Sequence, residues 1–582
     1  MIDVIYTKYD SEGRTIKKSP STQKLRGGYY TPPTIANFLA HWAIRHSTDK
    51  VLEPSCGDGN LLMAAGQVLL EHGTSSSALP NQIQGVEADS QEAIKARLRL
   101  EEFGMVWNGQ IREGDFFTFC RDKILGGTLL TGTLNNQQEY DVVIGNPPFI
   151  RYQTFPENQR TVAFEIMRRV GMNPNRLTNA WVPFLVASTL ALGKQGRLAM
   201  VIPAELLQVS YAEEIRQFLS IHYQEIIVVT FRNLVFENVQ QEIVLLLAEK
   251  GTNKNHLIRT LELEDTHALT STFPKLLFSA NGHKPLVSSK DKWTQYFLNA
   301  TEIEFLQTLK SHPQLMLTGE LFEASVGVVT GQNDFFLMSE VQRIKHHIGL
   351  ETVHPIVSRS AHLSGGIFSQ TDWIRNQEKF LPVHLFYPTN VPQVELPDSS
   401  QIYIQDGEQQ GIQKGYKCRI RPHWYHVSSV WKPDAFMLRQ VHKFPKLVLN
   451  QTGATCTDTI HRVRFRPNVD GHRVTGAFLN SLTFAFAEIT GRGYGGGVLT
   501  FEPSESRRLP MTLANAEQLD IEWIDCKLRS QKIEEVLEIN DTVLLQNGLG
   551  LNKKEVQMVR TIWAKLRDRR IHRKSARKTK TE

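Results

Sequence analysis

The stretch at residues 50–60, KVLEPSCGDGN, decides the fold class of this 582-residue chain. An apolar run leads into Gly57 and Gly59, and a helical pattern follows over residues 59–72. Glycines at a strand-to-helix turn let the backbone approach a ligand closely, and the first turn of a helix favours a negative group. The pattern predicts a β–α unit with a ligand-binding turn, although a tight turn without a ligand would have the same local sequence.

Further apolar runs alternate with helical patterns between residues 27 and 250. Continuous apolar runs are typical of strands that are buried on both faces of a parallel sheet. The predicted strands are KVLEPSC (50–56), IQGVEAD (83–89), DVVIGN (141–146), GRLAMVIP (196–203), EIIVVTF (225–231) and EIVLLLAE (242–249). The predicted helices cover residues 34–46, 59–72, 91–103, 179–192 and 212–221. This alternation predicts a doubly wound, Rossmann-like α/β domain.

The rest of the chain has a less regular pattern. Asn552 and Glu555 fit a helix N-cap and its capping-box partner, which predicts a helix that continues through Trp563. The predicted parts of the chain are an N-terminal arm (1–26), the α/β domain (27–250), a connector (251–299), an irregular α+β domain (300–515), and C-terminal helices with a basic tail (516–582).

The positive net charge of the chain comes from its last residues and not from its surface as a whole. Lys and Arg number 66 against 60 Asp and Glu, which gives a formal charge of +6. Residues 560–582 alone carry +8, so the residues before them sum to −2. We expect this tail to fray from a helix end into a disordered extension, with an auxiliary contact to phosphate groups as the second interpretation.

Several classes of protein are disfavoured by simple features of the sequence. The N-terminal residues carry charges early and lack the apolar stretch of a signal peptide. The most apolar region, residues 180–207, is interrupted by Lys194, Gln195 and Arg197, so no membrane span is expected. The five cysteines include no C-x-x-C pair, which disfavours a disulfide framework and a metal site. A cytoplasmic protein without a metal is the expectation.

Two acidic residues follow the glycine turn at the ends of later elements. Glu87 ends the second predicted strand, where a carboxylate can accept hydrogen bonds from the hydroxyls of a nucleoside ribose. Asp115 could accept from the exocyclic amine of an adenine, while Phe116 packs on the face of the ring. A surface glutamate and a helix N-cap are the respective alternatives.

The sequence Asp141-Val-Val-Ile-Gly-Asn146-Pro147-Pro148-Phe149 carries the most specific chemistry. Two prolines end the strand and fix the backbone. The Asn146 side-chain oxygen and the Pro147 carbonyl then provide two rigid acceptors at the carboxyl end of a strand, and Phe149 offers a face for stacking. Two acceptors and a stacking surface suit an amino group on an aromatic ring. A merely proline-terminated strand would not explain why nucleoside-type residues precede it in this order.

These motifs resemble those of S-adenosyl-L-methionine-dependent amino-methyltransferases, and most closely the gamma-class N6-adenine DNA methyltransferases of restriction–modification systems (the TaqI type). In that family a Thr-Pro-Pro segment precedes the glycine motif, as Thr31-Pro32-Pro33 does here, and the order through Asn-Pro-Pro-Phe is the same within residues 28–149. The resemblance implies a mainly parallel seven-stranded sheet and double-stranded DNA as the substrate. Asn146 fits adenine, where a serine would favour N4-cytosine.

The resemblance also implies roles for individual residues. The cofactor S-adenosyl-L-methionine is expected to contact Thr31, Glu53, Ser55, Cys56, Gly57, Glu87, Ala88, Asp115 and Phe116. Asn146, Pro147 and Phe149 are expected to form the catalytic motif, with Phe236 as a second stacking partner for a base flipped out of the duplex. Phe149 stands where several relatives have Tyr, which removes a hydroxyl group but keeps the stacking face.

The second domain resembles the target-recognition domains of the same enzymes more weakly. Residues 414–446 contain eight Lys or Arg and one acid, interleaved with aromatic side chains. Basic groups contact phosphates and aromatic rings pack on bases or sugars, so this segment predicts the DNA-facing surface. The candidate contacts are Arg419, Arg421, Trp424 and Tyr425. A solvated basic face over a small aromatic core is the alternative for each of them.

Several alternatives share parts of this pattern. A modification subunit of a multi-subunit restriction enzyme usually has a long helical region before the glycine motif, whereas about fifty residues precede Val51 here. A fused endonuclease would need a metal motif, and the sequence Asp525-Cys526-Lys527 fits one only by chance. An RNA or protein-glutamine methyltransferase would be more compact, and a non-catalytic DNA-binding protein would not need the intact motifs. A C5-cytosine enzyme needs a cysteine after a proline, which is absent.

The preferred interpretation is a monomeric, self-sufficient methyltransferase. It would protect host DNA, with a cognate restriction endonuclease that acts on the same site as a functional partner.

Overall fold

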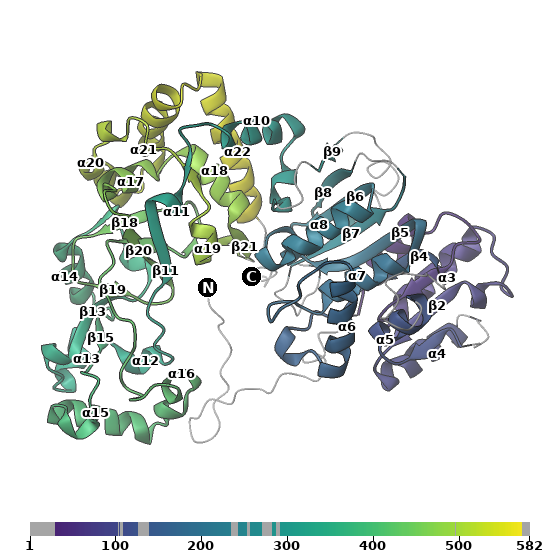
Figure 1. The fold of residues 1–582 in the computed structure, drawn as a ribbon, viewed down its shortest axis with the longest axis horizontal. Helices are drawn as coiled ribbons and strands as arrows, with labels where there is room; N and C mark the ends of the chain where they lie inside the picture. The colour runs from purple at the N-terminus through teal and green to yellow at the C-terminus, as the bar shows by residue number, and fades with distance from the viewer. Residues whose placement is uncertain are drawn as a thin grey trace, which may run out of the picture. The chain divides into compact units, whose positions relative to one another are not determined.

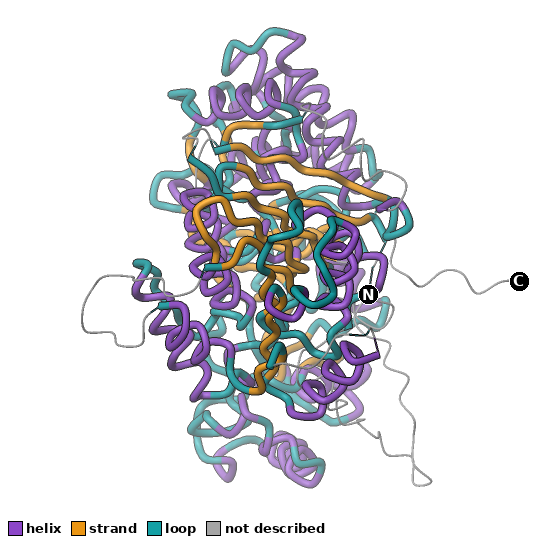
Figure 2. The backbone as a smooth tube through the Cα atoms, turned by 90° about the vertical axis from the view of Figure 1, so that its right-hand side faces the viewer, coloured by secondary structure: helices purple, strands orange, loops and turns teal. Residues whose placement is uncertain are grey.

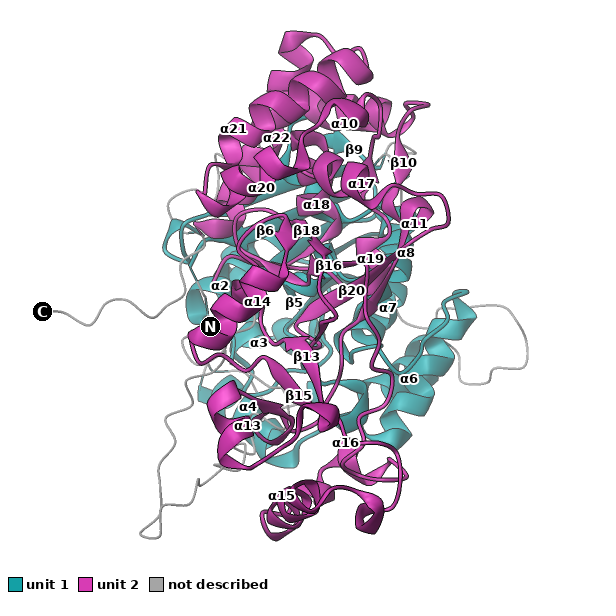
Figure 3. Ribbon diagram, turned by 90° about the vertical axis from the view of Figure 1, so that its left-hand side faces the viewer, with its two compact units in different colours: residues 1–299, 573–582 teal, residues 300–572 magenta. Residues whose placement is uncertain are grey.

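The computed structural model describes residues 30–102, 104, 109–125, 139–233, 235, 242–252, 256–269, 282–286, 291–494 and 496–572. The chain divides into two compact units, shown in Figure 3. Unit 1 contains Met1–Asn299 and Arg573–Glu582, and unit 2 contains Ala300–His572. The expected N-terminal arm (1–26), Phe236 and the end of the basic tail lie outside the described residues.

A mixed, mostly parallel sheet forms the centre of unit 1. Its described strands are β1 (Val51–Glu53), β2 (Ile83–Glu87), β3 (Ile111–Glu113), β4 (Tyr140–Gly145), β5 (Leu192–Pro203), β6 (Glu225–Phe231), β7 (Ile243–Glu249), β8 (Leu257–Leu263) and β9 (Lys284–Pro285). The order is β3-β2-β1-β4-β5-β7-β6-β8-β9, and Figure 1 shows most of these labels in this sequence across the sheet. In this order each of the strands β3, β2, β1, β4 and β5 is parallel to its neighbours within this group. β7 is antiparallel to both of its neighbours, β5 and β6.

Helices cover both faces of this sheet, as expected for a doubly wound fold (Figure 2). The described helices of unit 1 are α2 (Pro33–Ala43), α3 (Asn60–Glu71), α4 (Ser90–Glu102), α5 (Phe116–Phe119), α6 (Glu157–Arg169), α7 (Trp181–Ala191) and α8 (Glu213–His222). Apolar side chains of α2, α3 and α4 share one core cluster with alternate strand residues such as Val51, Val142 and Ala199. α7 packs against β4 and β5, with α6 and α8 beside it.

The sheet differs from the expected seven strands at one edge. β8 and β9 come from the segment 251–299, which the sequence analysis treats as a connector. β8 pairs in parallel with the whole of β6, from Glu225 with Leu257 to Phe231 with Leu263. The sequence LIRTLEL is only partly buried, because it lies toward the edge of the sheet, and it therefore lacks the continuous apolar run of the central strands.

Unit 2 combines several small sheets with helices. Its described strands are β10 (Met316–Leu317), β11 (Phe322–Val326), β12 (Leu337–Met338), β13 (Val353–Val357), β14 (Ile367–Phe368), β15 (His384–Phe386), β16 (Ala435–Leu438), β17 (Gln440–Val441), β18 (Leu447–Asn450), β19 (Thr455–Cys456), β20 (Ile460–Phe465), β21 (Arg492–Tyr494), β22 (Val498–Thr500) and β23 (Pro510–Met511). Their orders are β11-β20-β16-β18-β14, β12-β15-β13-β19, β17-β22-β21 and β10-β23. This mixture agrees with the expected irregular α and β region.

The helices of unit 2 include those at the C-terminal end of the described chain. They are α10 (Ala300–Lys310), α11 (Thr318–Leu321), α12 (Asn333–Phe336), α13 (Glu340–Lys345), α14 (Gln370–Glu378), α15 (Asp398–Gln409), α16 (Tyr416–Arg419), α17 (Gly471–Ala477), α18 (Ser481–Thr490), α19 (Pro503–Ser506), α20 (Ile521–Arg529), α21 (Ile533–Asn540) and α22 (Lys553–Ile571). Within the described chain, none of the helices combines the length and the apolar character that crossing a membrane requires.

The last helix, α22, is an integral part of unit 2. Asn552 Oδ1 accepts from the backbone N–H groups of Lys554 and Glu555, and Glu555 Oε2 accepts from the Asn552 N–H, which confirms the predicted capping box. Near its other end, Arg570 forms a buried ion pair with Glu488 of α18. The segment expected as separate C-terminal helices is therefore packed into unit 2.

Candidate active site

The motifs predicted to bind the cofactor and the substrate meet at the carboxyl ends of the central strands of the unit 1 sheet. β1 pairs in parallel with β2 on one side and with β4 on the other. The carboxyl ends of three neighbouring strands therefore lie together, and this edge is where α/β proteins bind ligands. The Ser55 hydroxyl donates a hydrogen bond of 3.4 Å to the backbone carbonyl of Asn146, so the glycine turn and the Asn-Pro-Pro-Phe motif are in direct contact.

The glycine turn has the backbone conformation that its sequence suggests. Gly57 and Gly59 have φ of 50° and 82°, in the left-handed region that favours glycine. A Cβ at Gly59 would lie 3.1 Å from Cα of Ala96, because α3 and α4 approach closely there. A Cβ at Gly57 would meet nothing within 4 Å, so the backbone at Gly57 borders open space in which a ligand could approach.

Glu87 is tied to this turn through its side chain. Its Oε2 accepts from the backbone N–H of Gly57 at 2.8 Å, and its Oε1 accepts from the N–H of Asp89 at 2.8 Å. Partial burial raises the pKa of the Glu87 carboxyl, while these two hydrogen bonds act in the opposite direction. The carboxylate is thus fixed beside the glycine turn, and each oxygen keeps a further lone pair for a hydroxyl donor.

Glu53, the last residue of β1, is a buried carboxyl group that is not fully satisfied. It is 2% exposed, and its Oε2 has no hydrogen-bond partner among the described residues. Burial raises its pKa well above the ordinary value, and the nearby carboxylates of Asp58 and Glu87 raise it further. A buried carboxyl group with an unpaired oxygen is costly. A cationic ligand at this position would remove that cost.

Cys56 and Ala88 can contribute little through their side chains. Cys56 is 4% exposed and belongs to the core cluster under α3, and burial raises the pKa of its thiol well above the ordinary value. Its backbone N–H donates to the carbonyl of Val86, and its own carbonyl accepts from the N–H of Gly59, so its backbone groups are also engaged within the protein. Ala88 is exposed directly after β2.

Asp115 and Phe116 begin α5, and the structure changes the expectation for the phenyl ring. Asp115 caps the helix, and its Oδ2 accepts from both the N–H and the hydroxyl of Thr118 at 2.8 Å. Both bonds end on one oxygen, so the cap does not need the other. Phe116 is 2% exposed and stacks on Phe184 with 5.4 Å between ring centroids. Its ring belongs to the core, which corrects the expected packing on an adenine face.

The Asn146-Pro147-Pro148-Phe149 motif, expected to be catalytic, follows directly after β4. The Asn146 Nδ2 donates a hydrogen bond of 3.2 Å to Oγ1 of Thr31, a residue just before α2 that is 5% exposed. Pro147 is buried, whereas Phe149 is half-buried and packs against the core cluster. A Cβ at Gly145 would lie 3.2 Å from Cδ of Pro54, so the two motif loops are packed tightly.

A hydrogen-bonded network of polar side chains, which the sequence did not predict, holds Thr31 next to the glycine turn. Asn60, at the start of α3, donates from Nδ2 to the carbonyl of Thr31 at 3.3 Å. Arg99 of α4 donates to Oδ1 of Asn60 and forms an ion pair of 2.7 Å with Asp58. The adjacency of Asp58 and Asn60 to the glycine motif could have suggested a role, but nothing local in the sequence marks Arg99.

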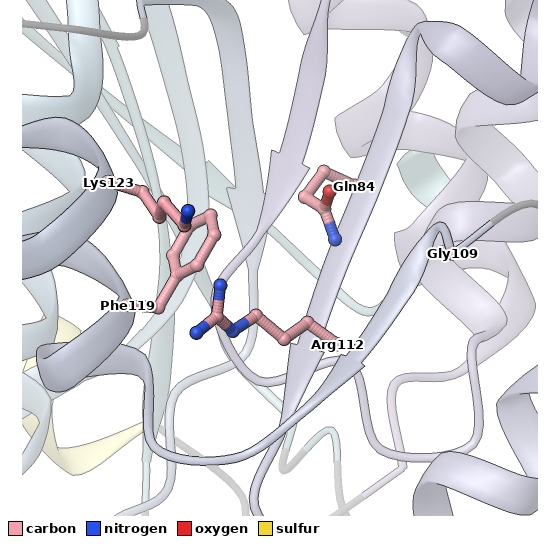
Figure 4. Close-up of a pocket in the computed structure, with 5 residues that line it drawn as sticks. All are labelled: Gln84, Gly109, Arg112, Phe119 and Lys123. Atoms are coloured by element: carbon pink, nitrogen blue, oxygen red, sulfur yellow. The ribbon is translucent and has the colours of Figure 1, made fainter.

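A separate hollow lies along β2 and β3. This pocket of about 430 Å³ is lined by Gln84, Gly109, Arg112, Phe119 and Lys123 (Figure 4). The guanidinium group of Arg112 lies 5.3 Å from the centroid of the Phe119 ring. None of the residues expected to bind the cofactor lines this pocket. It is therefore not the candidate active site.

Three of the four candidate DNA contacts in unit 2 also make contacts within that unit. Arg421 donates to the backbone carbonyls of Val329, Thr330 and Trp424 at 2.7–3.3 Å. The ring of Trp424 packs against the core cluster of unit 2 around Phe335, and its Nε1 donates to Glu408.

Tyr425 is 3% exposed, and its hydroxyl donates to the carbonyl of Val391. Tyr425 therefore belongs to the core and not to an exposed DNA-facing surface, whereas Arg421 and Trp424 remain partly exposed. Arg419 alone of the four is exposed, on α16 beside exposed Lys417.

The Asp525-Cys526-Lys527 sequence is likewise structural. Asp525 Oδ1 accepts from the backbone N–H groups of Gly366 and Ile367, and its other oxygen pairs with Arg529. Lys527 pairs with Glu535 of the next helix. The carboxylate thus fastens α20 to a loop of unit 2, in agreement with a chance occurrence of the motif.

Comparison with known proteins gives matches over both units. Residues 15–271 match the family model of N-6 DNA methylases, and residues 290–545 match the model of the C-terminal domain of the type II methyltransferase M.Eco57I. The chain is 22% identical to the type II methyltransferase M.AccI of Acinetobacter calcoaceticus over 543 residues, which cover 90% of each chain. It is also 22% identical to M.XamI of Xanthomonas campestris pv. amaranthicola, over 83% of this chain and 84% of that relative.

Among solved structures, the chain resembles the Type IIL restriction-modification enzyme MmeI in complex with DNA. The TM-score is 0.56 at 11% sequence identity, and the match covers 92% of this chain and 75% of that one. At this level of identity the likeness concerns the fold.

Proposed function

This chain belongs to the N6-adenine DNA methyltransferases of type II restriction–modification systems, and we propose that Asn146 and its neighbours form the catalytic site. The observation that carries the proposal is the contact of the two motif loops. Ser55 bonds the carbonyl of Asn146, and Asn146 bonds Thr31, so the candidate cofactor site and the candidate acceptor for an amino group share one edge of the sheet.

The residues around the glycine turn fit S-adenosyl-L-methionine. That cofactor carries a sulfonium and an ammonium group, and the unpaired oxygen of buried Glu53 offers a negative partner for a cation. Gly57 leaves space for a close approach of the ligand, Glu87 would accept from the ribose hydroxyls, and Asp115 would accept from the adenine amine with the oxygen that its cap does not use. When bound, the cofactor supplies an activated methyl group.

Asn146, Pro147 and Phe149 would hold the substrate base. An adenine flipped out of double-stranded DNA would stack on Phe149, with Phe236 proposed as the opposite face. The Asn146 Oδ1 and the Pro147 carbonyl would accept the two hydrogens of the N6 amino group. These bonds draw the nitrogen lone pair out of the ring, so that it points toward the methyl group. Positioning and electrostatics would then favour direct methylation without a covalent intermediate, in which the N6–carbon bond forms as the carbon–sulfur bond of the cofactor breaks, and N6 would lose one of its two protons.

Unit 2 would read the DNA sequence in this proposal, with exposed Arg419 and Lys417 of α16 as phosphate contacts. The chain would act as a monomer. Its functional partner would be a restriction endonuclease that recognises the same site.

Substitution of Asn146 by Ala tests the proposal. The variant should bind S-adenosyl-L-methionine as the wild type does, in a calorimetric titration, but it should transfer no labelled methyl group to unmethylated DNA. Asn81→Ala, an exposed residue of the same unit, serves as the matched control and should keep full activity. Near-normal methylation by Asn146→Ala, or label that appears as N4-methylcytosine or only in RNA, would contradict the assignment.

A further inference from the structure

A short loop of unit 1 presents an apolar side chain to solvent. Residues 170–180 join α6 to α7, and the side chains of Arg176 and Leu177 are exposed at its tip. Leu177 is 69% exposed, more than any other large apolar side chain described in unit 1. Apolar surface in water is unfavourable, and this leucine contributes nothing to the core. Most of its side chain is therefore accessible to a molecule outside the chain.

Hydrogen bonds hold the tip of the loop in one conformation. Asn175 Oδ1 accepts from the backbone N–H of Leu177 at 2.8 Å, and Thr178 Oγ1 accepts from the N–H of Asn175 at 3.0 Å. On one flank, Asn173 donates two hydrogen bonds to the carboxylate of Glu214 on α8. The turn is thus preorganised, so its backbone would lose little conformational freedom when Leu177 contacts a binding partner.

The loop is joined directly to the strand end that carries the catalytic motif. The backbone N–H of Ala180 donates to the carbonyl of Ile150 at 2.9 Å, and Ile150 follows Phe149 in the chain. α6 and α7 lie side by side, as Figure 1 shows, and α7 leads back to β5, which is parallel to β4. The end of this loop at Ala180 therefore lies near the carboxyl end of β4, in contact with Ile150, the residue that follows Phe149.

We propose that Leu177 is a wedge that enters the DNA base stack where the target adenine has left it, while Arg176 contacts a neighbouring phosphate. Proteins that unstack base steps insert apolar side chains between them, and arginine is a common phosphate contact. Extrusion of a base costs stacking and pairing energy. A leucine in the vacated space restores contact with the neighbouring bases. The inference rests on the proposed flipping of adenine at Asn146.

The test compares wild type, Leu177→Ala and Leu177→Met. The recognition site is first located by modified-base sequencing of methylated plasmid DNA, and two duplexes that contain it are then made. One duplex is fully paired, and the other has an abasic site opposite the target adenine, so that extrusion is already easy. For Leu177→Ala we expect kcat/KM to fall about 10-fold or more on the paired duplex and less than about 3-fold on the abasic one. Leu177→Met should stay close to wild type on both.

A fluorescent base gives a second readout. With 2-aminopurine at the target position, the rise in fluorescence on binding should be smaller for Leu177→Ala than for wild type. Leu98→Ala is the matched control, because Leu98 is an exposed leucine of α4 in the same unit, at 54% exposure. It should leave both readouts unchanged.

Arg176→Gln tests the phosphate contact. It should lower the slope of log affinity against log salt by about one, without a change of the methylated sequence.

Two results would contradict the proposed role of Leu177 as a wedge. One is unchanged activity of Leu177→Ala on the paired duplex, and the other is an equal loss on both duplexes, which would indicate a contact unrelated to extrusion. Either result leaves the wild-type methylation of adenine and its loss in Asn146→Ala untouched. Failure of the proposed function would instead be seen as an absence of N6-methyladenine in the wild-type reaction.

Discussion

The Nδ2 of Asn146 donates a hydrogen bond of 3.2 Å to the hydroxyl oxygen of Thr31, which lies 115 positions earlier in the chain. This bond directs the Nδ2 end of the amide toward Thr31, so the Oδ1, which we propose as the acceptor for an amino group, is the opposite end. Thr31 is thereby a positioning residue for the proposed reaction, in addition to its expected place near the cofactor.

Replacement of Thr31 by Val should remove this restraint. A neutral hydrogen bond is worth about 0.5–1.5 kcal/mol, so we expect kcat to fall about 3- to 10-fold, while Thr31→Ser stays near wild type. Thr74→Val is the control, because it loses a similar bond, to the carbonyl of Ser47, away from the site. Steady-state methylation and cofactor titration are the measurements. A rise in the Kd for the cofactor without a fall in kcat would contradict the positioning role.

Replacement of Glu53 by Gln should separate stability from cofactor binding. Burial raises the pKa of the Glu53 carboxyl, so the folded chain binds more protons here than the unfolded chain as pH rises above the ordinary carboxyl range. The unliganded wild type should therefore lose stability relative to Glu53→Gln as pH rises through this window. S-adenosyl-L-methionine should stabilise the wild type more than the variant. Thermal unfolding at several pH values, with and without the cofactor, measures both effects, and equal stabilisation of the two proteins would exclude Glu53 as the partner of the cation.

Arg421 and Arg419 are close in sequence but should respond differently to substitution. Arg421→Ala leaves three backbone carbonyls without their charged donor and should lower the free energy of unfolding by about 2 kcal/mol. Arg419→Ala should change stability by less than about 0.5 kcal/mol, while it weakens DNA binding and reduces the salt slope by about one. Urea unfolding and DNA titration at several salt concentrations test this contrast. A stable Arg421→Ala protein with selectively weakened DNA binding would support the original expectation for that residue.

His362 should make unit 2 sensitive to mild acid. Burial, with a smaller contribution from the nearby charge of Arg359, lowers the pKa of His362 from its ordinary value to about 4. Between about pH 4 and the ordinary histidine value of 6.5 the unfolded chain binds the extra proton, so stability should rise with pH across this window. In His362→Gln this part of the pH dependence should be absent. Unfolding curves from pH 4 to 7 measure it, and identical profiles for the two proteins would exclude the effect.

Local sequence was sufficient for the features that depend on short-range chemistry. The strands at residues 141–146 and 225–231 were visible because buried parallel strands are continuously apolar. The capping box at Asn552 was visible because its two partners are three residues apart. By contrast, β8 was missed, because a strand next to the edge of the sheet that is only partly buried has no continuous apolar run.

The candidate site divides in the same way. The sequence by itself determined which residue types end each strand, and their order alone made Asn146, Glu87 and the glycine turn the candidate site, because the residues that end a strand are consecutive in the chain. Only the tertiary structure decided that Phe116 and Tyr425 are core residues, that Arg99 supports Thr31 through Asn60, and that Leu177 is exposed in a loop whose last residue, Ala180, bonds Ile150. Those facts depend on contacts between residues far apart in the chain, and such contacts leave no local pattern because they form only when the helices pack on the sheet.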